Sequence, residues 1–281
     1  MKRSNYFVSV CPLPFREGNL TMQIQSFASG SGGNCALVSG GGKYILVDAG
    51  ISLRRIKACL ANRDLSLCDI SAVFLTHEHG DHVGALPMLE KYTDIPIITS
   101  GGTARSVMSK GKFAGKNIEI IESGEVVDIE GIAVKAFSTS HDAAESFGST
   151  FECGCEKVAV TTDLGRITQE VRSAVLGATA VLLEANHDVD MLRVGPYPWQ
   201  LQQRILGPNG HLSNEDSGRF ALELAEQGVR HILLAHLSKE NNTPRLAYTT
   251  VADILINGGV EPGSLKMNVA PADEMSCILE T

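Results

Sequence analysis

Short apolar runs rich in β-branched residues alternate along this chain with longer segments whose apolar residues recur at helical spacing. A short run of this kind predicts a strand, and a longer segment with a period near 3.6 predicts an amphipathic helix. The expected strands are Gln23–Ala28, Asn34–Ser39, Tyr44–Asp48, Ala72–Thr76, Ile95–Thr99, Ile118–Ile121, Ile132–Ser138, Ser149–Cys153, Val158–Thr162, Ala180–Glu184 and His231–Ala235. The expected helices are Ser52–Asn62, Val83–Tyr92, Gly102–Lys110, Ile167–Leu176, Pro198–Ile205, Asn214–Gln227 and Thr243–Asn257.

The order of these elements predicts an α/β fold. The early strands follow one another through glycine turns such as Gly40-Gly41-Gly42, which indicates antiparallel hairpins. The later half alternates strand and helix, so the two halves together suit a four-layer αββα sandwich of two mixed β-sheets flanked by helices. We expect residues 22–281 to form a single hydrolase domain and residues 1–21 to be an N-terminal extension, with Met22 as an alternative start.

Composition narrows the class of protein. No apolar run approaches the ~18–20 residues that cross a bilayer, and Pro12 and Pro14 interrupt the mildly apolar N-terminal stretch, so we expect neither a membrane partner nor a secretory signal. Seven cysteines, an odd number, indicate reduced thiols in a cytoplasmic protein. The net charge of −8 excludes a protein that coats nucleic acid with a globally basic surface. A nucleic-acid substrate must therefore meet a local basic patch or bound metal ions.

The strongest chemical signal follows the buried strand Ala72–Thr76. There the sequence reads His77-Glu-His79-Gly-Asp81-His82, and the whole chain has only eight histidines. Four ligand-type side chains this close cannot all reach one ion, but they can divide between two. His77 and His79 project to the same side, and after the turn that Gly80 permits, Asp81 and His82 can address a second ion. The motif predicts a metal site rather than a solvated polar loop.

Each ion needs further ligands, and three candidates stand where expected strands end. His141 follows Ile132–Ser138, Asp163 follows Val158–Thr162, and His236 follows His231–Ala235. Strand ends that face one crevice are where α/β folds gather functional side chains. A single histidine beyond a strand usually has a structural role, but the incomplete first motif favours ligation here.

These residues, in this order and spacing, resemble the metal-ligand set of the metallo-β-lactamase superfamily. The resemblance implies that His77, His79 and His141 hold one ion, that Asp81, His82 and His236 hold the other, and that the Asp163 carboxylate bridges them. It also implies that Asp48 orients the cluster without touching metal, although a turn residue before Ala49-Gly50 would explain it equally. Three further segments, Ser26–Asn34, Leu182–Asp188 and Met191–Asp216, are similar to the YycJ (WalJ) family of 5′-to-3′ DNA exonucleases linked to mismatch repair.

Imidazole and carboxylate ligands suit Zn²⁺ or Mn²⁺, and also iron, and two such ions favour hydrolysis. Together with this chemistry, the resemblance to the YycJ/WalJ family implies a dinuclear-metal phosphodiesterase that acts on DNA as a 5′-to-3′ exonuclease, with a role in DNA repair. Asp81 is expected to orient the attacking water and accept its proton, and His211 to assist the leaving oxygen. Two alternatives stay open: a phosphodiesterase for small molecules or nucleotides, and a non-catalytic sensor that binds metal or nucleotide.

Candidate substrate contacts lie in three places. Ser29, Ser31 and Asn34 belong to a glycine-rich segment that can cradle a phosphate, although a hairpin turn explains it as well. His211 and Ser213 precede the helix Asn214–Gln227, whose N-terminus attracts anions, while capping alone explains Ser213. The remaining candidates are His187, a loop histidine; Arg193 and Arg204, for which a solvated surface is the default; and Tyr197 and Trp199, which can stack on bases, with a core position as the alternative for Trp199.

Overall fold

The computed structural model describes residues 21–111 and 113–281, which form two seven-stranded sheets. The first sheet has the order β14 (Leu279–Glu280), β1 (Met22–Ala28), β2 (Cys35–Gly40), β3 (Lys43–Val47), β4 (Ile70–Phe74), β5 (Ile97–Thr99) and β6 (Ile118–Ile120). The second has the order β13 (Lys266–Val269), β12 (His231–Ala235), β11 (Ala180–Glu184), β10 (Glu156–Thr161), β9 (Phe147–Cys153), β8 (Ile132–Ser138) and β7 (Val126–Ile129). Residues 1–20 of the expected N-terminal extension lie outside the described part of the chain.

Both sheets are mixed, as the sequence predicts. Strands β1 to β3 and β7 to β10 run antiparallel to their neighbours, whereas β3 to β6 and β10 to β13 are parallel. The β2–β3 hairpin turns at Gly41 and Gly42, whose φ angles of 57° and 76° favour glycine. The consecutive early strands therefore form the predicted hairpins.

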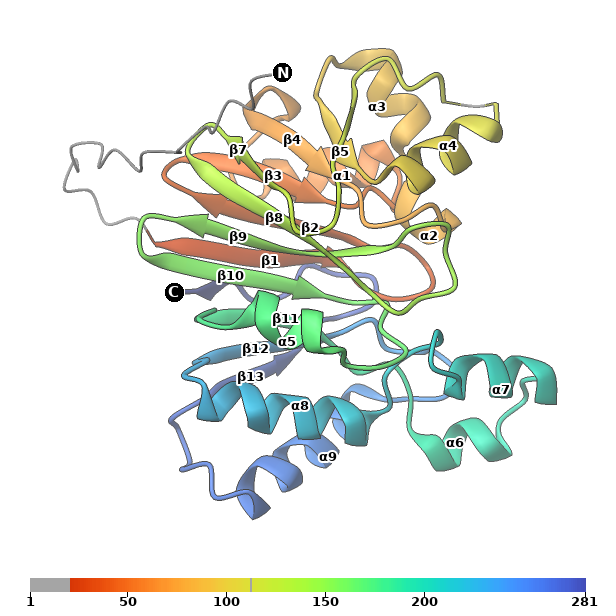
Figure 1. The fold of residues 1–281 in the computed structure, drawn as a ribbon, viewed down its shortest axis with the longest axis vertical. Coiled ribbons are helices and arrows are strands. Elements are labelled where there is room, and N and C mark those ends of the chain that lie inside the picture. The colour runs from red at the N-terminus through yellow and green to blue at the C-terminus, as the bar shows by residue number, and fades with distance from the viewer. Residues whose placement is uncertain (1–20, 112) are drawn as a thin grey trace, which may run out of the picture.

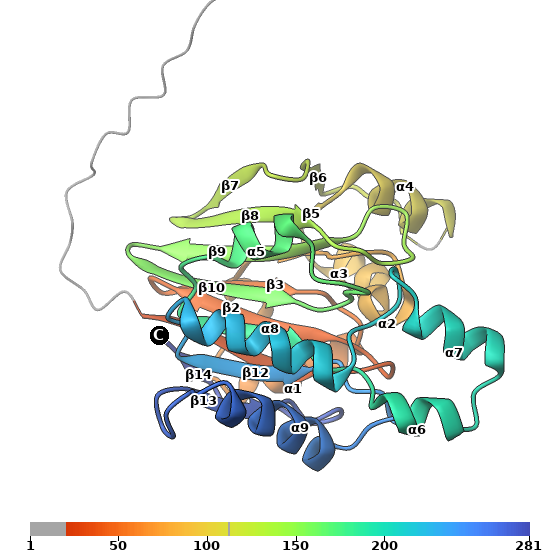
Figure 2. The ribbon, with the colours of Figure 1, turned by 60° about the horizontal axis from the view of Figure 1, so that its bottom comes forward.

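Helices cover the outer face of each sheet (Figure 1). The helices are α1 (Leu53–Ala61), the 3₁₀ turn η1 (Leu67–Asp69), α2 (Gly80–Val83), α3 (Leu86–Tyr92), α4 (Gly101–Ser109), α5 (Gln169–Val175), α6 (Val189–Val194), α7 (Trp199–Leu206), α8 (Asn214–Glu226) and α9 (Pro244–Asn257). Helices α1, α3 and α4 pack on the first sheet, and α5, α8 and α9 pack on the second. Helices α6 and α7 stand apart from these layers, at one end of the sandwich (Figure 2).

Three apolar cores hold the four layers together. The central core joins the two sheets, with Phe74 of β4 edge-on to Phe151 of β9 at 6.2 Å between ring centroids. One outer core packs α1 and α3 on the first sheet, and the other packs α8 and α9 on the second. The α/β sandwich expected from the sequence is thereby confirmed, and no helix in the described ranges is long and apolar enough to cross a membrane.

The structure differs from the predicted elements at a few places. The helix predicted over Val83–Tyr92 begins later, at Leu86, and Val83 instead ends the short helix α2. Pro87 suits the first turn of α3, and the backbone N–H of Ala85 donates to Ala49 O at 2.8 Å instead of continuing α2. Strands β7, β13 and β14 and helix α6 were not predicted from the sequence. These elements have between two and six residues, too few for a periodic pattern.

Candidate metal centre

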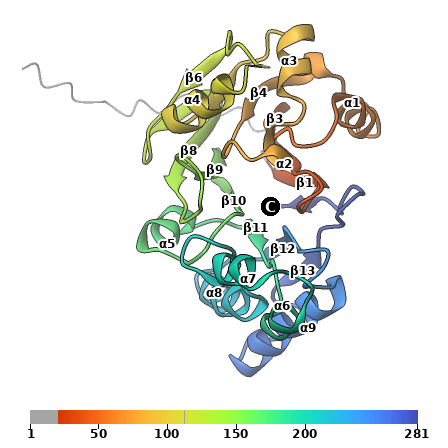
Figure 3. The same cartoon turned by 90° about the vertical axis from the view of Figure 1, so that its right-hand side faces the viewer.

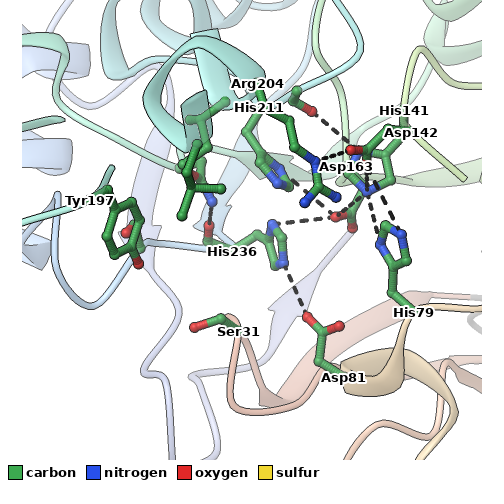
Figure 4. A pocket seen from close by; sticks show the side chains of 15 residues that line it. Ser31, His79, Asp81, His141, Asp142, Asp163, Tyr197, Arg204, His211 and His236 are labelled. Carbon is green, nitrogen blue, oxygen red and sulfur yellow. Dashed lines mark hydrogen bonds and ion pairs between the residues drawn. The ribbon is translucent and has the colours of Figure 1, made fainter. Parts of the chain in front are cut away.

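The sequence-predicted ligands converge at the end of the sandwich where strands of both sheets end. Figure 3 looks onto this end, and Figure 4 shows His79, Asp81, His141, Asp163 and His236 there. The His77–His82 segment follows β4, and His141 comes from the loop after β8. The register of β10, β11 and β12 brings the ends of these strands side by side: Thr161 of β10 lies opposite Leu183 of β11, and Glu184 of β11 lies opposite Ala235 of β12. Side chains just beyond these strands therefore face the same space.

Three imidazoles form the first group. The Nε2 atom of His77 lies 3.0 Å from Nδ1 of His79, which in turn lies 3.2 Å from Nε2 of His141. All three potential ligand atoms lie within 4.8 Å of one another. Three nitrogen lone pairs directed at one point form a suitable set for a divalent ion.

Asp81, His82 and His236 form the second group, with ligand atoms again within 4.8 Å of one another. Asp163 lies between the two groups. Its Oδ1 atom is 3.6 Å from Nε2 of His141, and its Oδ2 atom is 3.6 Å from Nε2 of His82. Oδ1 lies equally far, 3.6 Å, from Nδ1 of His236, so the carboxylate is close to both groups, as a bridging ligand must be.

The outward-facing nitrogens of the histidines have partners of their own. Nδ1 of His82 lies 2.8 Å from Asp48 Oδ2, and Nδ1 of His236 lies 2.8 Å from Glu184 Oε1. Nδ1 of His141 lies 3.2 Å from the carbonyl of Gly210. These contacts fix each ring so that its other nitrogen faces the centre, as in known metal sites.

Two buried atoms at the centre make no hydrogen bond within the described part of the chain: Asp163 Oδ2 and His236 Nε2. Both residues are at least 96% buried, so leaving these atoms without a partner is costly. A cation at each group would give both atoms a partner, and an imidazole nitrogen and a carboxylate oxygen are ligand types that divalent metal ions prefer. The residues present therefore fit a pair of divalent metal ions.

The electrostatics of the centre point the same way. Burial raises the pKa of Asp163, but the surrounding imidazoles of His236, His82, His77 and His141 lower it further, so it lies well below its ordinary value. Burial lowers the pKa of His82, but Asp48 and Asp163 outweigh it and raise this pKa to about 9. Carboxylates thus dominate the second group and favour positive charge in it.

Backbone conformation marks the site as well. Asp48, Asp163 and His236 have φ angles of 61°, 58° and 59°, in the left-handed region that non-glycine residues seldom adopt. Each stands just after a strand of the fold. Such conformations cluster at functional sites, where they aim a side chain that the ordinary strand geometry would direct elsewhere.

Glu184 is a site residue that the sequence analysis missed. It is fully buried at the end of β11, and its Oε1 accepts hydrogen bonds from Nδ1 of both His236 and His211 at 2.8 Å. Burial raises its pKa, but the charges of His211 and His236 and their hydrogen bonds lower it to about 2. An acidic residue at the end of a predicted strand, like Asp48 and Asp163, was the signal available in the sequence.

A cavity of about 240 Å³ opens onto the centre (Figure 4). Asp81 and His211, with side chains 25% and 20% exposed, reach it from opposite sides. Its wall also includes Ser31, Tyr197, Leu201, Arg204 and Ile205. Arg204 forms an ion pair with Asp142, which lines the same cavity.

Other predicted substrate contacts occupy different positions. The Ser29 hydroxyl accepts from the backbone N–H of His236 at 2.7 Å and so supports the centre from behind. The Asn34 amide nitrogen lies 2.9 Å from Nε2 of His82 and donates to Asp81 Oδ2 at 3.3 Å, so Asn34 contacts the second group on its inner side. Ser213 caps α8 by accepting from Asp216 N at 3.1 Å. His187 is 1% exposed and lies outside the cavity wall, and Arg193 faces solvent on α6.

Comparison with known proteins identifies the fold and the family. Residues 43–237 match the family described as "Beta-lactamase superfamily domain". The chain is 36% identical over 243 residues to "Exodeoxyribonuclease YycJ" of Bacillus anthracis, covering 86% of this chain and 92% of the relative. The chain belongs to the YycJ/WalJ family of the metallo-β-lactamase superfamily. The resemblance read from the His77–His236 ligand pattern is thus confirmed, and this membership makes the chain a metal-dependent hydrolase.

One further similarity supports the family and another supports the fold. "Exodeoxyribonuclease WalJ" of Streptococcus pneumoniae is 35% identical over 240 residues, 84% of this chain and 89% of that protein. Among solved structures, the metallo-β-lactamase fold protein YhfI from Bacillus subtilis has a TM-score of 0.71 at 16% identity, covering 94% of this chain and 100% of that one. At this low identity the second similarity shows the fold alone.

Proposed function

We propose that this YycJ/WalJ-family member is a dinuclear-metal phosphodiesterase that digests DNA from the 5′ end, and that it acts in DNA repair in the cytoplasm. The observation that carries the proposal is the completeness of the two ligand groups around Asp163, next to an open cavity. Relatives named exodeoxyribonucleases, similar over more than four fifths of this chain, support DNA as the substrate.

The proposed ligands are those that the geometry gathers: His77, His79 and His141 for one ion, Asp81, His82 and His236 for the other, and Asp163 between them. Two divalent ions, Zn²⁺ or Mn²⁺, would activate a water molecule and neutralise the charge that develops on the phosphoryl oxygens.

Asp81 is the proposed base that orients the attacking water and accepts its proton. Burial raises the pKa of Asp81, but His236 and His82 lower it further, so its carboxylate is ionised at neutral pH. His211 is the proposed proton donor to the leaving oxygen. Glu184 holds Nδ1 of His211 at 2.8 Å, which leaves Nε2 as the ring atom that can reach a substrate.

A labelled-duplex assay tests this function. The purified protein is incubated with Mn²⁺ and a duplex labelled at either end of one strand. Stepwise release of nucleotides from the 5′ end supports the proposal, whereas release from the 3′ end contradicts its polarity.

Hydrolysis confined to small phosphodiesters would instead identify the alternative enzyme, and the small cavity volume gives that alternative its support. No turnover of either substrate, with metal bound, would favour a sensor. Asp81→Ala is the loss-of-function control. Glu223→Gln is the matched control, because Glu223 forms a surface ion pair with Arg172 away from the centre.

A further inference from the structure

One wall of the cavity is apolar and aromatic, although the wall opposite carries the metal-ligand candidates. Tyr197, Leu201 and Ile205 line it, and all three belong to the segment 189–206, which we name the α6–α7 arm. Leu201 and Ile205 are one helical turn apart and present the same side of α7. A phosphate placed over the metal centre would therefore have an apolar surface beside it.

Helix α7 has no buried residue, and its first residue, Trp199, is 71% exposed. The arm projects from the end of the sandwich, so the rest of the fold does not cover this face (Figures 1 and 2). Trp199 stands two residues from Tyr197, so its exposed ring belongs to the same arm as the apolar residues that line the cavity. Arg193 and Arg204 stand on the same two helices, paired with Asp190 and Asp142 respectively, so the arm presents these charges as ion pairs.

The position of Tyr197 is tightly held. It stands between Pro196 and Pro198, which restrict the backbone, and its carbonyl accepts a hydrogen bond from Gln202 Nε2 at 2.9 Å. The other end of α7 is fixed to the centre, because Ile205 O accepts from the backbone N–H of His211 at 3.0 Å. The arm thus holds an aromatic ring at a set place relative to the proposed proton donor.

We propose that the α6–α7 arm is a base-stacking platform for the end of the substrate strand, a proposal that rests on the nuclease function above. The Tyr197 ring stacks on the base of the terminal nucleotide while its phosphate lies at the metal centre, and Trp199 stacks on a neighbouring base outside the cavity. The cavity of about 240 Å³ that Tyr197 lines opens directly onto the metal centre, so one nucleotide can contact both.

A kinetic test compares the wild type with Tyr197→Ala on a single strand that has either a normal or an abasic terminal nucleotide. Loss of base–aromatic stacking should raise KM for the normal strand by about 5-fold to 150-fold. With the abasic strand the two proteins should have the same KM, because the ring has lost its partner. Tyr197→Phe should restore the wild-type KM, and Tyr92→Ala, which removes an exposed tyrosine at the end of α3, is the matched control.

The outcomes separate the two proposals. If the wild type cleaves no DNA, the nuclease function fails and the platform fails with it. If the wild type cleaves DNA but Tyr197→Ala raises KM equally for normal and abasic strands, or not at all, only the stacking platform is overturned.

A binding test needs no turnover. Trp199 is the only tryptophan in the chain, so the emission of the protein reports on it directly. Stacking on a base should quench this emission when a phosphorothioate strand that resists cleavage is added. Unchanged emission at saturation, established by the anisotropy of a labelled strand, would overturn the role of Trp199.

Discussion

Replacement of Glu184 by glutamine should weaken the binding of one metal ion more than that of the other. The carboxylate accepts four hydrogen bonds: from Nδ1 of His211 and of His236 on Oε1, and from the backbone N–H groups of Leu164 and Leu212 on Oε2. A glutamine side chain has one oxygen, so its NH₂ group must face two donors. The variant loses two hydrogen bonds to a charged acceptor, at ~1.5–3 kcal/mol each, or ~3–6 kcal/mol before relaxation.

The metal effect follows from which histidine loses its support. His236 belongs to the group with Asp81 and His82, whereas the His77, His79 and His141 group does not touch Glu184. Removing a residue that orients a ligand typically lowers metal affinity or activity by ~10–100-fold. Titration with Zn²⁺ followed by calorimetry should therefore show one site of wild-type affinity and one weakened site.

Two controls separate the loss of metal affinity from a general loss of charge or stability. Glu223→Gln removes the same charge from a surface ion pair and should leave both affinities unchanged. Urea unfolding of the metal-free proteins measures the stability cost separately from metal binding. Two wild-type affinities and turnover within twofold of the wild type in Glu184→Gln would show that Glu184 orients neither histidine.

Three further predictions concern pH and packing. Because the pKa of His82 is about 9 in the metal-free protein, metal binding must displace its proton. Metal affinity should therefore rise between pH 6 and 9, and calorimetry in buffers of different ionisation enthalpy should detect the released proton. A metal affinity that does not change with pH would contradict this. Burial lowers the pKa of His187 from 6.5 to about 4, so its contribution to stability is full above pH 6.5 and is lost as the pH falls toward 4, by about 1.4 kcal/mol per pH unit. When urea unfolding at pH 7 is compared with unfolding at pH 5, the free energy of unfolding of His187→Phe should fall by less than that of the wild type. Equal falls in the two proteins would refute this. A Cβ at Gly210 would lie 2.1 Å from the carbonyl oxygen of Ile205, so Gly210→Ala should lower both the Tm and turnover by shifting the turn that holds His141; unchanged values would contradict the geometry.

Most of the strands, and the candidate ligands at their ends, were predictable from the sequence for the same physical reason. Apolar strand runs such as Ile132–Ser138 are distinct, and the polar residues directly after them stand out against a buried background. The ligand set could be written down because histidine is rare and concentrated at strand ends. The grouping of those ligands depends on strand register, which no local pattern contains.

The substrate contacts were less predictable because local sequence does not show which way a side chain faces. Ser29 and Asn34 lie in a glycine-rich loop, yet Ser29 contacts His236 and Asn34 contacts His82. Glu184 was overlooked because a strand that ends in glutamate is common, and its role depends on two histidines 27 and 52 residues away. Helix α6 was not predicted because six residues show little periodicity.

Anomalous diffraction from crystals of the metal-loaded protein tests the central claim most directly. The account predicts two peaks, ~3.5–4 Å apart, on either side of the Asp163 carboxylate. One peak should be bound by His77, His79 and His141, and the other by Asp81, His82 and His236. A single peak, or metal bound elsewhere with these side chains unligated, would contradict it.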